Sequence, residues 1–412
     1  MKLAIRCYVI AALVTLTLCN GSYAAAPRIF ILNGPQLAEA REEIRRGADR
    51  QMPALEQLRR DARAALEVGP FTVVSKETAP PSGDKHDYMS IAPYWWPNPN
   101  TADGMPYVRR DGERNPDIYK VRDRLQLGEM IDAVETLALA YYFTGDEAFA
   151  KRAGVLVRTW FLDPDTRMNP HLEYGQAVPG ENTGRGAGLI ESRHLTRVID
   201  SVALLSESDA WTDDDQRELE AWFEKFLVWM QQSDIGRDEA DADNNHGTYY
   251  DVQIAAYSLF TGKTDQAAEV LQAVGDKRIA DQVEPDGRQP EELERTKAWS
   301  YSVGNLAGLM TLARLGEHVE VDLWHYETKD GRSIRAALDY LIPFGIEEQS
   351  WPYQQINGFD PSLIYPLLHI AAAKYPDGPY AELLERISKD NSADRSNLLV
   401  SPLDPISNLH KK

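Results

Sequence analysis

Cysteine is almost absent from this sequence. Its 412 residues contain only two, Cys7 and Cys19, and both lie near the N-terminus. Beyond residue 19 the chain therefore offers no disulfide and no cysteine metal ligand, so its hydrophobic core must hold the fold together. A chain of this length can bury a core large enough for that purpose.

Positive charge is scarce as well. The chain has 44 Lys and Arg against 64 Asp and Glu, a formal net charge of −20. Such a negative field argues against nucleic acid and against anionic membrane surfaces as partners. It does not exclude an acidic polysaccharide, provided that the basic residues gather in one cleft.

Long hydrophobic runs are limited to one, from Cys7 to Cys19. Basic residues precede it and Ala24-Ala25-Ala26 follows it, a pattern typical of a secretory signal peptide. We therefore predict a signal peptide over residues 1–26 and one domain over residues 27–412, periplasmic or secreted and not inserted in a membrane. Loss of Lys2 and Arg6 with the signal would take the charge from −20 to −22. A lipoprotein site at Cys19 is the alternative, which the bulky Leu18 disfavours.

Strand-like alternation is nearly absent, whereas helical periodicity recurs along the chain. The pattern predicts helices at residues 37–46, 54–66, 125–144, 147–161, 191–205, 213–232, 248–261, 264–274, 291–315, 333–342, 362–374 and 380–389. Thr212, followed by three aspartates, is a strong helix start. Many helices in succession without an exact repeat indicate an all-α fold, an α/α toroid: an incomplete barrel of antiparallel helical hairpins with long rim loops.

The stretch 71–116 has no helical period and is rich in proline, glycine and aromatic residues. A loop of this length is usually functional or disordered, and its aromatic content argues against disorder. We expect it to form the rim of the toroid together with residues 168–176. Candidate substrate contacts in the two segments are Tyr94, Trp95, Trp96, His171 and Gln176. The aromatic rings can stack on sugars, although Trp96 can equally pack the loop down.

The most informative motif is the polar run Asn244-Asn245-His246-Gly247-Thr248-Tyr249-Tyr250, which opens a predicted helix. Two carboxamides before a histidine place hydrogen-bond donors and a near-neutral base at a helix start, where free N–H groups add positive potential. His246 shares a helical face with Tyr249 or Tyr250. The ordinary alternative is that Asn-Asn only caps the helix. Glu239 either orients His246 or an arginine, or is one solvated acid among others.

A second candidate pair, Arg295 and Tyr301, lies in the predicted helix 291–315. Six residues on an ideal helix separate two side chains by about 120°. The pair would therefore share a site only if the helix is irregular or if the two residues reach the site from different sides. Lys297, one turn before Tyr301, is the alternative cation.

Together these segments resemble the alginate lyase superfamily, which includes related glucuronan lyases. The resemblance rests on residues 244–253, on Tyr94-Trp95-Trp96-Pro97, on Met168-Asn169-Pro170 with Tyr174-Gly175-Gln176, and on Arg295 with Tyr301. It implies a polysaccharide lyase that cleaves a 1,4-linked polyuronate of the alginate or polymannuronate type by β-elimination, leaving 4,5-unsaturated ends. The spacing of six from arginine to tyrosine looks more like the glucuronan-lyase branch, so glucuronan is the alternative substrate.

Under this resemblance Asn245, His246 and Arg295 neutralise the substrate carboxylate, and a donor so placed is worth roughly 2.7–4 kcal/mol. Tyr301 then removes the C5 proton and protonates the leaving O4, since a nearby cation can favour its phenolate. The reverse assignment, with His246 as base and Tyr301 as acid, stays open. The expected substrate contacts are Asn244, Gln176, His171, Tyr94, Trp95, Trp96, Tyr250 and Glu239.

Two other classes of protein fit the sequence. A glycoside hydrolase on an α/α toroid needs two carboxylates about 5 to 9.5 Å apart, and Glu173, Glu191 and Asp251 are among the candidates. A non-catalytic polyuronate-binding protein would not need Tyr301. The eight histidines are scattered without metal-ligand spacing, so we predict neither a metal nor another cofactor.

Overall fold

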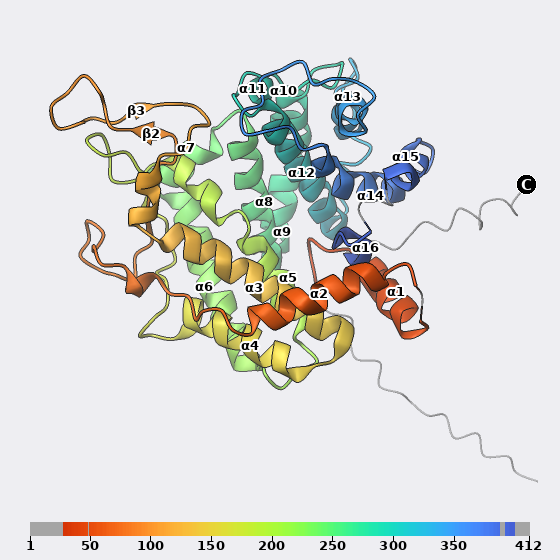
Figure 1. The fold of residues 1–412 in the computed structure, drawn as a ribbon, viewed down its shortest axis with the longest axis horizontal. Helices are drawn as coiled ribbons and strands as arrows, with labels where there is room; N and C mark the ends of the chain where they lie inside the picture. The colour runs from red at the N-terminus through yellow and green to blue at the C-terminus, as the bar shows by residue number, and fades with distance from the viewer. Residues whose placement is uncertain (1–27, 48, 388–391, 400–412) are drawn as a thin grey trace, which may run out of the picture.

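The computed structural model describes residues 28–47, 49–387 and 392–399. The predicted signal peptide and the predicted end of the last helix at residue 389 lie outside these residues. Helices dominate the described chain and are grouped around a common centre, as Figure 1 shows. The predicted all-α toroid is confirmed. Within the described residues, no helix has the length and apolar character needed to cross a membrane.

The helices fall into long and short ones. The long helices are α1 (Gly34–Arg45), α2 (Met52–Ala65), α3 (Asp123–Thr144), α4 (Glu147–Val157), α5 (Leu195–Leu204), α6 (Asp213–Gln232), α8 (Asn245–Phe260), α9 (Thr264–Val274), α12 (Ala298–Gly316), α13 (Ile334–Gly345), α14 (Tyr365–Lys374) and α15 (Tyr380–Ile387). The short elements are α7 (Asp234–Ala240), α10 (Ala280–Gln282), α11 (Pro290–Leu293), α16 (Ser396–Leu399) and the strands β1 (Met89–Ile91), β2 (Trp95–Trp96), β3 (Val108–Arg109) and β4 (Tyr174–Ala177).

The burial of each helix follows its sequence pattern. In α8, 14 of 16 residues are buried, because the helix is apolar on most of its faces and packs against α6, α9 and α12. In α6 the buried residues recur at helical spacing on one face only, from Leu219 to Met230. The predicted start of α6 is also confirmed, with Thr212 and Asp215 forming a reciprocal capping box. Helix α8 therefore lies in the interior of the toroid and α6 on its outside.

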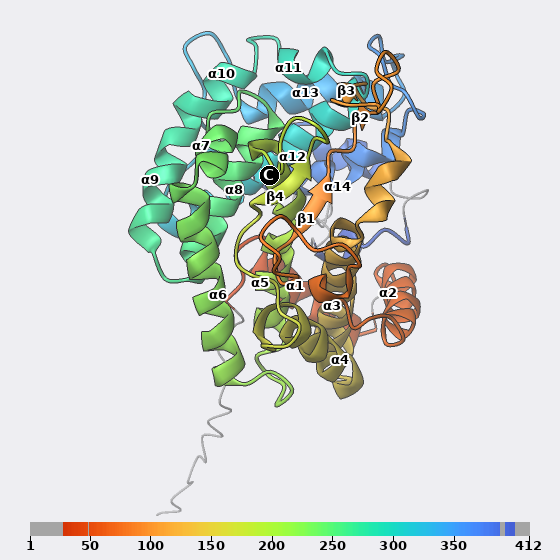
Figure 2. The ribbon, with the colours of Figure 1, turned by 90° about the vertical axis from the view of Figure 1, so that its left-hand side faces the viewer.

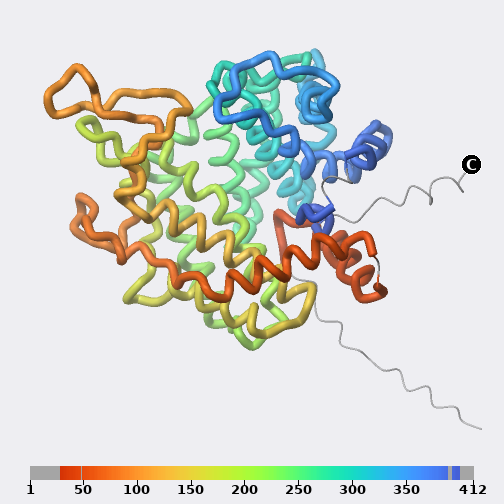
Figure 3. Tube along the Cα trace, viewed as in Figure 1, coloured from red at the N-terminus to blue at the C-terminus, as the bar shows by residue number. Residues whose placement is uncertain are grey.

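The two segments predicted as rim elements lie side by side. Strand β1 pairs in parallel with β4, and β2 pairs antiparallel with β3, so that Trp95 lies opposite Arg109. Figures 1 and 2 both place β2 and β3 at the same end of the molecule as α7, α10 and α11, and Figure 3 traces the loop between the strands projecting there. This end of the toroid is the one that carries the motifs singled out in the sequence.

The structure differs from the predicted helices in two segments, and it contains a further helix. The predicted helix 291–315 is two helices, α11 and α12, separated at residues 294–297. Tertiary contacts take the backbone donors there: Thr296 donates to the carboxylate of Asp111, and Ala298 donates to the carbonyl oxygen of Gln354. The predicted helix 191–205 begins instead as a 3-10 turn over Gly186–Ser192, followed by α5, and α7 was not predicted at all.

Near the N-terminus, an irregular segment is fixed to the body of the toroid through one buried side chain. The carboxylate of Asp200 on α5 accepts hydrogen bonds from the backbone N–H groups of Phe30, Ile31 and Leu32, at 2.7–2.9 Å. Asp200 is 2% exposed. Three donors on one buried carboxylate hold this segment in place before α1 begins.

Candidate active site

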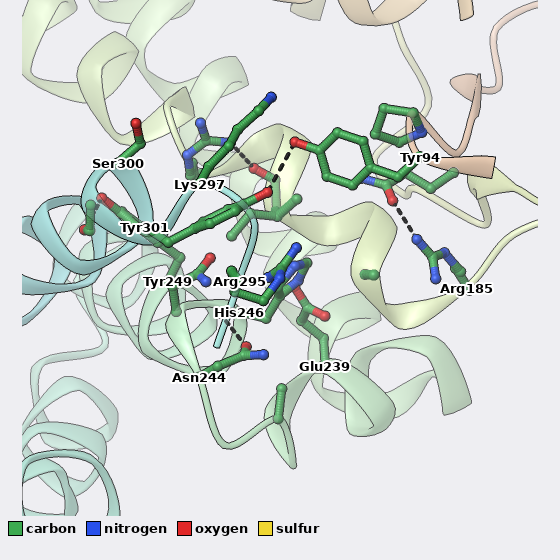
Figure 4. Close-up of a pocket in the computed structure, with 18 of the residues that line it drawn as sticks. Tyr94, Arg185, Glu239, Asn244, His246, Tyr249, Arg295, Lys297, Ser300 and Tyr301 are labelled. Atoms are coloured by element: carbon green, nitrogen blue, oxygen red, sulfur yellow. Dashed lines mark hydrogen bonds and ion pairs between the residues drawn. The ribbon is translucent and has the colours of Figure 1, made fainter. Parts of the chain in front are cut away.

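A cavity of about 740 Å³ opens at the rim end of the toroid. Figure 4 shows many of its residues, which come from the rim loop, α7, the start of α8 and the start of α12. Its lining includes Tyr94, Trp95, Arg109, Arg114, Arg124, Gln176, Arg185, Arg193, His194, Asp238, Glu239, Asp241, Asn244, Asn245, His246, Tyr249, Arg295, Lys297 and Tyr301. The two motifs predicted to meet, residues 244–246 and residues 295–301, therefore do meet.

The cavity is basic although the chain as a whole is acidic. Its lining carries seven Arg and Lys side chains and three Asp and Glu side chains, against a formal charge of −20 for the whole sequence. A cleft whose charge opposes that of the surrounding surface concentrates anions. The basic residues thus gather in one cleft, which was the condition set for an acidic polysaccharide as ligand.

The start of α8 places Asn245 and His246 in the lining. The side chain of Asn244 caps the helix by accepting a hydrogen bond from the backbone N–H of His246, at 3.0 Å. The next position must be glycine, since a Cβ on Gly247 would lie 2.0 Å from the carbonyl oxygen of Ala242. Capping and presentation of polar side chains, which the sequence left as alternatives, occur together.

His246 is oriented by Glu239 on α7. Its Nδ1 lies 2.7 Å from Oε1 of Glu239, whose side chain is 3% exposed. A carboxylate on Nδ1 favours the tautomer in which that nitrogen carries the proton, so Nε2 keeps its lone pair. The expected pairing of Glu239 with His246 is present, and it leaves His246 with a basic nitrogen for a ligand.

Arg295 and Tyr301 share one site because the helix between them is broken. The guanidinium carbon of Arg295 lies 4.2 Å from the centre of the Tyr301 ring. Arg295 also donates to Asp111 of the rim loop through Nε and Nη2, at 3.1 and 2.8 Å. It is not paired with Glu291, as a continuous helix would have allowed. Asp111 takes the N–H of Nε and one N–H of Nη2, which leaves the other N–H groups of the guanidinium to serve a ligand.

The environment of Tyr301 favours its protonated phenol. Its hydroxyl donates to the hydroxyl of Tyr94 over 2.9 Å. Burial, and then the neighbouring Tyr94, raise the pKa of Tyr301 well above its ordinary value, although Arg295 acts in the opposite direction. Arg295 thus acts on the phenol in the expected direction, but desolvation outweighs the cation and the net effect favours the protonated form.

Among the predicted rim residues, Tyr94, Trp95 and Gln176 line the cavity. The side-chain oxygen of Gln176 accepts from Arg185 at 2.8 Å, and the guanidinium of Arg185 lies over the ring of Trp95 at 5.7 Å. The backbone of Gln176 has a φ of 51°. A left-handed glutamine is a strained conformation of the kind that clusters at binding sites.

Three predicted contacts lie outside the lining. Trp96 donates to the carbonyl oxygen of Glu113 and so packs the loop, which was the alternative stated for it. Nε2 of His171 lies 2.9 Å from the carboxylate of Asp87. Tyr250 is buried and donates to the carbonyl oxygen of Met230. The helix starts at Asn245 and not at Thr248. Of the two neighbouring tyrosines considered for the site, Tyr249 lines the cavity and Tyr250 does not.

Several cavity residues were not singled out from the sequence: Arg109, Arg114, Arg124, Arg185, Arg193 and His194. They come from several segments far apart in the sequence, so no local pattern marks them as parts of one site. Arg193 packs over the ring of Tyr249 at 5.7 Å. Burial lowers the pKa of His194 to about 3, with Arg193 and Arg197 adding to the effect, so its imidazole is neutral.

The acids proposed for a hydrolase are engaged elsewhere. Glu173 accepts a hydrogen bond from Trp229, Glu191 accepts hydrogen bonds from Tyr88 and Ser90, and Asp251 pairs with Arg278. None of the three lines the cavity. A search of the described part of the chain for groups of three or more His, Cys, Asp or Glu residues able to hold a metal ion finds none.

Comparison with known proteins agrees with this site. The family model for alginate lyase matches residues 72–351, most of the chain. A crystal structure of an alginate lyase from Bacteroides ovatus is 41% identical, with a TM-score of 0.87, and the match covers 90% of this chain and 99% of that one. The chain therefore belongs to the alginate lyase family, and it is a polysaccharide lyase.

More distant structures share the fold alone. Alginate lyase A1-III from Sphingomonas species A1 is 14% identical with a TM-score of 0.51, and the match covers 88% of this chain and 89% of that one. A variant of A1-III in complex with a tetrasaccharide is 13% identical with a TM-score of 0.55, covering 85% of this chain and 89% of that one. A search of the curated proteins finds no match.

Proposed function

We propose that this lyase cleaves a 1,4-linked polyuronate of the alginate type by β-elimination. The observation that carries the proposal is the meeting of Asn245, His246, Arg295 and Tyr301 in one basic cavity. A uronate carboxylate bound there would face the amide of Asn245 and the guanidinium of Arg295. Neutralising that carboxylate makes the adjacent C5 proton acidic enough to remove, since donors aimed at developing charge stabilise the enolate-like intermediate.

The proton transfers can be assigned from the hydrogen bond of His246 and the protonated state of Tyr301. His246 has its Nδ1 on Glu239, so Nε2 is free to take the C5 proton. Tyr301 keeps its proton and is suited to give it to O4. The C5–H electron pair forms the C4–C5 double bond, the C4–O4 bond breaks, and O4 leaves protonated. Acid and base help of this kind typically contributes a factor of roughly 10² to 10⁴.

Tyr301 acting alone is the other assignment of the proton transfers. In mannuronate and glucuronate, H5 and O4 lie on the same face of the ring, so one side chain can serve both. Tyr301 would then have to lose its proton on substrate binding, against the effect of its burial. His246→Gln distinguishes the two assignments, because glutamine keeps a hydrogen-bond donor for the substrate carboxylate but cannot take H5, so the double bond should fail to form only if His246 is the base.

The test is to incubate the purified protein with polymannuronate, mixed alginate and glucuronan and to follow the ultraviolet absorbance of the new double bond. We expect absorbance to rise with at least one of these polymers. In Tyr301→Phe the rate of this rise should be lower by a factor of about 10² or more, because one acid–base group is lost. New reducing ends without absorbance would indicate hydrolysis and contradict the proposal. Binding without cleavage would support the non-catalytic alternative.

Export completes the proposal. The N-terminal pattern of residues 1–26 predicts a protein that meets its polymer outside the cytoplasm. Sequencing the N-terminus of the native protein tests this prediction. Cleavage near Ala26 is expected, and a native chain that still begins at Met1 would contradict it.

A further inference from the structure

A buried carboxylate lies directly behind Asn245. Glu292 on α11 is 1% exposed. Its Oε1 accepts the backbone N–H of Asn245 at 2.7 Å, and Nδ2 of Asn245 lies 2.9 Å from each of the two carboxylate oxygens. Within the described chain, the hydrogen bonds to this carboxylate all come from Asn245.

Burying a carboxylate lowers the stability of the fold unless hydrogen bonds compensate for the lost hydration. Burial raises the pKa of Glu292, although the hydrogen bonds from Asn245 oppose this. A packing role alone would be met by an apolar side chain of similar size. The contacts instead satisfy one of the N–H groups that the first turn of α8 leaves without a partner inside the helix.

The same contacts fix the rotation of the Asn245 carboxamide. The terminal torsion of an asparagine side chain is soft, so an unrestrained amide samples a broad range of orientations. One N–H of Nδ2 can be shared between the two Glu292 oxygens, which leaves the second N–H for a ligand. Glu292 thereby selects the orientation in which Asn245 presents a donor.

Glu292 also links the two segments that build the site. Asn245 is 47 residues away in the sequence, whereas Arg295 follows Glu292 by three and donates its backbone N–H to the carbonyl oxygen of Glu292 at 3.3 Å. A buried amide network continues the link: Asn305 on α12 donates to the side chains of Gln282 and Gln289. Asn245 and Arg295 are thus set relative to one another by one short helix.

From these contacts we propose that Glu292 is a positioning residue, whose carboxyl group holds the Asn245 carboxamide in the orientation that receives the uronate carboxylate. The inference rests on the proposed elimination and deepens it. Glu292 does not touch the substrate and acts through Asn245. Replacing Glu292 should therefore lower kcat only in a protein that still has the Asn245 carboxamide.

The experiment is a double-mutant cycle between Glu292→Gln and Asn245→Ala, with kcat and KM measured by double-bond absorbance. Glutamine keeps the size of the side chain but turns an NH₂ group toward the donors of Asn245, so the carboxamide must rotate away. We expect Glu292→Gln to lower kcat by about 10-fold or more while KM changes by less than about 3-fold, the pattern of an interaction made in the transition state. In the Asn245→Ala background the same change should alter kcat by less than about 2-fold.

The matched control is Glu291→Gln, the exposed neighbour on the same helix, which should leave kcat unchanged. The proposal is overturned if Glu292→Gln keeps wild-type kcat, or if it lowers kcat equally in both backgrounds. If Glu292→Gln does not fold, as judged by its thermal unfolding, Glu292→Asp replaces it in the same cycle, because aspartate draws the carboxylate back by one methylene. The same two outcomes then decide.

The wild-type assay separates this proposal from the one on which it rests. A wild-type protein that produces no double bond from any polyuronate would contradict both. An active wild type with equal losses in the two backgrounds would overturn only the positioning role of Glu292.

Discussion

The hydroxyl group of Tyr301 donates to the hydroxyl group of Tyr94, a residue 207 positions earlier in the chain. One ring stands at the start of α12 and the other on the rim loop. The acid of the proposed elimination therefore has its hydrogen-bond partner on a different element of the fold. Through this contact the rim loop takes part in the chemistry and is more than an edge of the cavity.

Replacing Tyr94 by phenylalanine should weaken catalysis. A lost hydrogen bond of about 0.5–1.5 kcal/mol corresponds to a fall in kcat of roughly 2- to 10-fold. Burial would still keep the pKa of Tyr301 above its ordinary value, so the loss should come from the missing hydrogen-bond partner. Tyr119→Phe, at an exposed tyrosine, is the control. Wild-type kcat in Tyr94→Phe would contradict a role for the Tyr94 hydroxyl in holding the acid.

Glu239→Gln should lower kcat by about 10- to 100-fold. A hydrogen bond to a charged group contributes about 1.5–3 kcal/mol, and glutamine can present its NH₂ group to Nδ1 and so disfavour the required tautomer of His246. KM should change less, because Glu239 is expected to orient the base and not the sugar. Glu218→Gln on the outer face of α6 is a control that should match the wild type. Wild-type kcat in Glu239→Gln would show that His246 needs no such partner.

Arg278→Lys should destabilise the protein and disturb the site. The guanidinium of Arg278, 1% exposed, donates to Asp251 and to the carbonyl oxygens of Ala240 and Ala242, just before the Asn244 cap. A lysine ammonium cannot span three acceptors in this fork geometry. We expect the free energy of unfolding in urea to fall by about 1.5–3 kcal/mol, one charged hydrogen bond. Arg217→Lys on the exposed face of α6 should leave the urea midpoint unchanged, and an equal midpoint for Arg278→Lys would refute the prediction.

His369 should make the fold sensitive to acid. It is 3% exposed, and neither ring nitrogen has a hydrogen-bond partner within the described residues. Burial lowers its pKa from 6.5 to about 4. Between these values the unfolded chain binds the proton and the native chain does not, so the contribution of His369 to stability is complete above pH 6.5 and is lost as the pH falls toward 4.

The measurement for His369 is the free energy of unfolding as a function of pH in wild type and His369→Leu. The leucine variant should show a shallower loss of stability between pH 6.5 and 4. His325→Gln, at an exposed histidine, should keep the wild-type slope. Parallel curves for wild type and His369→Leu would mean that the buried imidazole does not cause the loss of stability at low pH.

Much of the architecture could be predicted because the apolar residues recur at helical spacing within each segment. Helix α6 shows this most clearly, since its apolar spacing and its Thr212 start are both short-range signals. The residues that meet in the cavity could be named where they occur in runs, as in Asn244-Asn245-His246. Such a run can be recognised in the sequence without knowing which segments face it across the cavity.

The remainder depends on contacts between distant segments. The break before α12 is set partly by Asp111, which lies 185 residues from Thr296, and no local signal could place it. Arg185 and Arg193 are isolated in the chain and become part of the site only through the fold. Tyr249 lines the cavity in place of Tyr250 because Tyr250 turns toward α6, where its hydroxyl donates to the carbonyl oxygen of Met230, a contact that the local sequence does not reveal.

The Asp200 carboxylate gives the stretch 30–32 an importance that its lack of regular structure would not suggest. A recombinant form that begins at Gly34, where the first helix starts, would leave a buried charge without its three amide donors. The cost of an uncompensated interior charge is several kcal/mol. The safe boundary for shortening this enzyme from its amino end therefore lies ahead of Phe30.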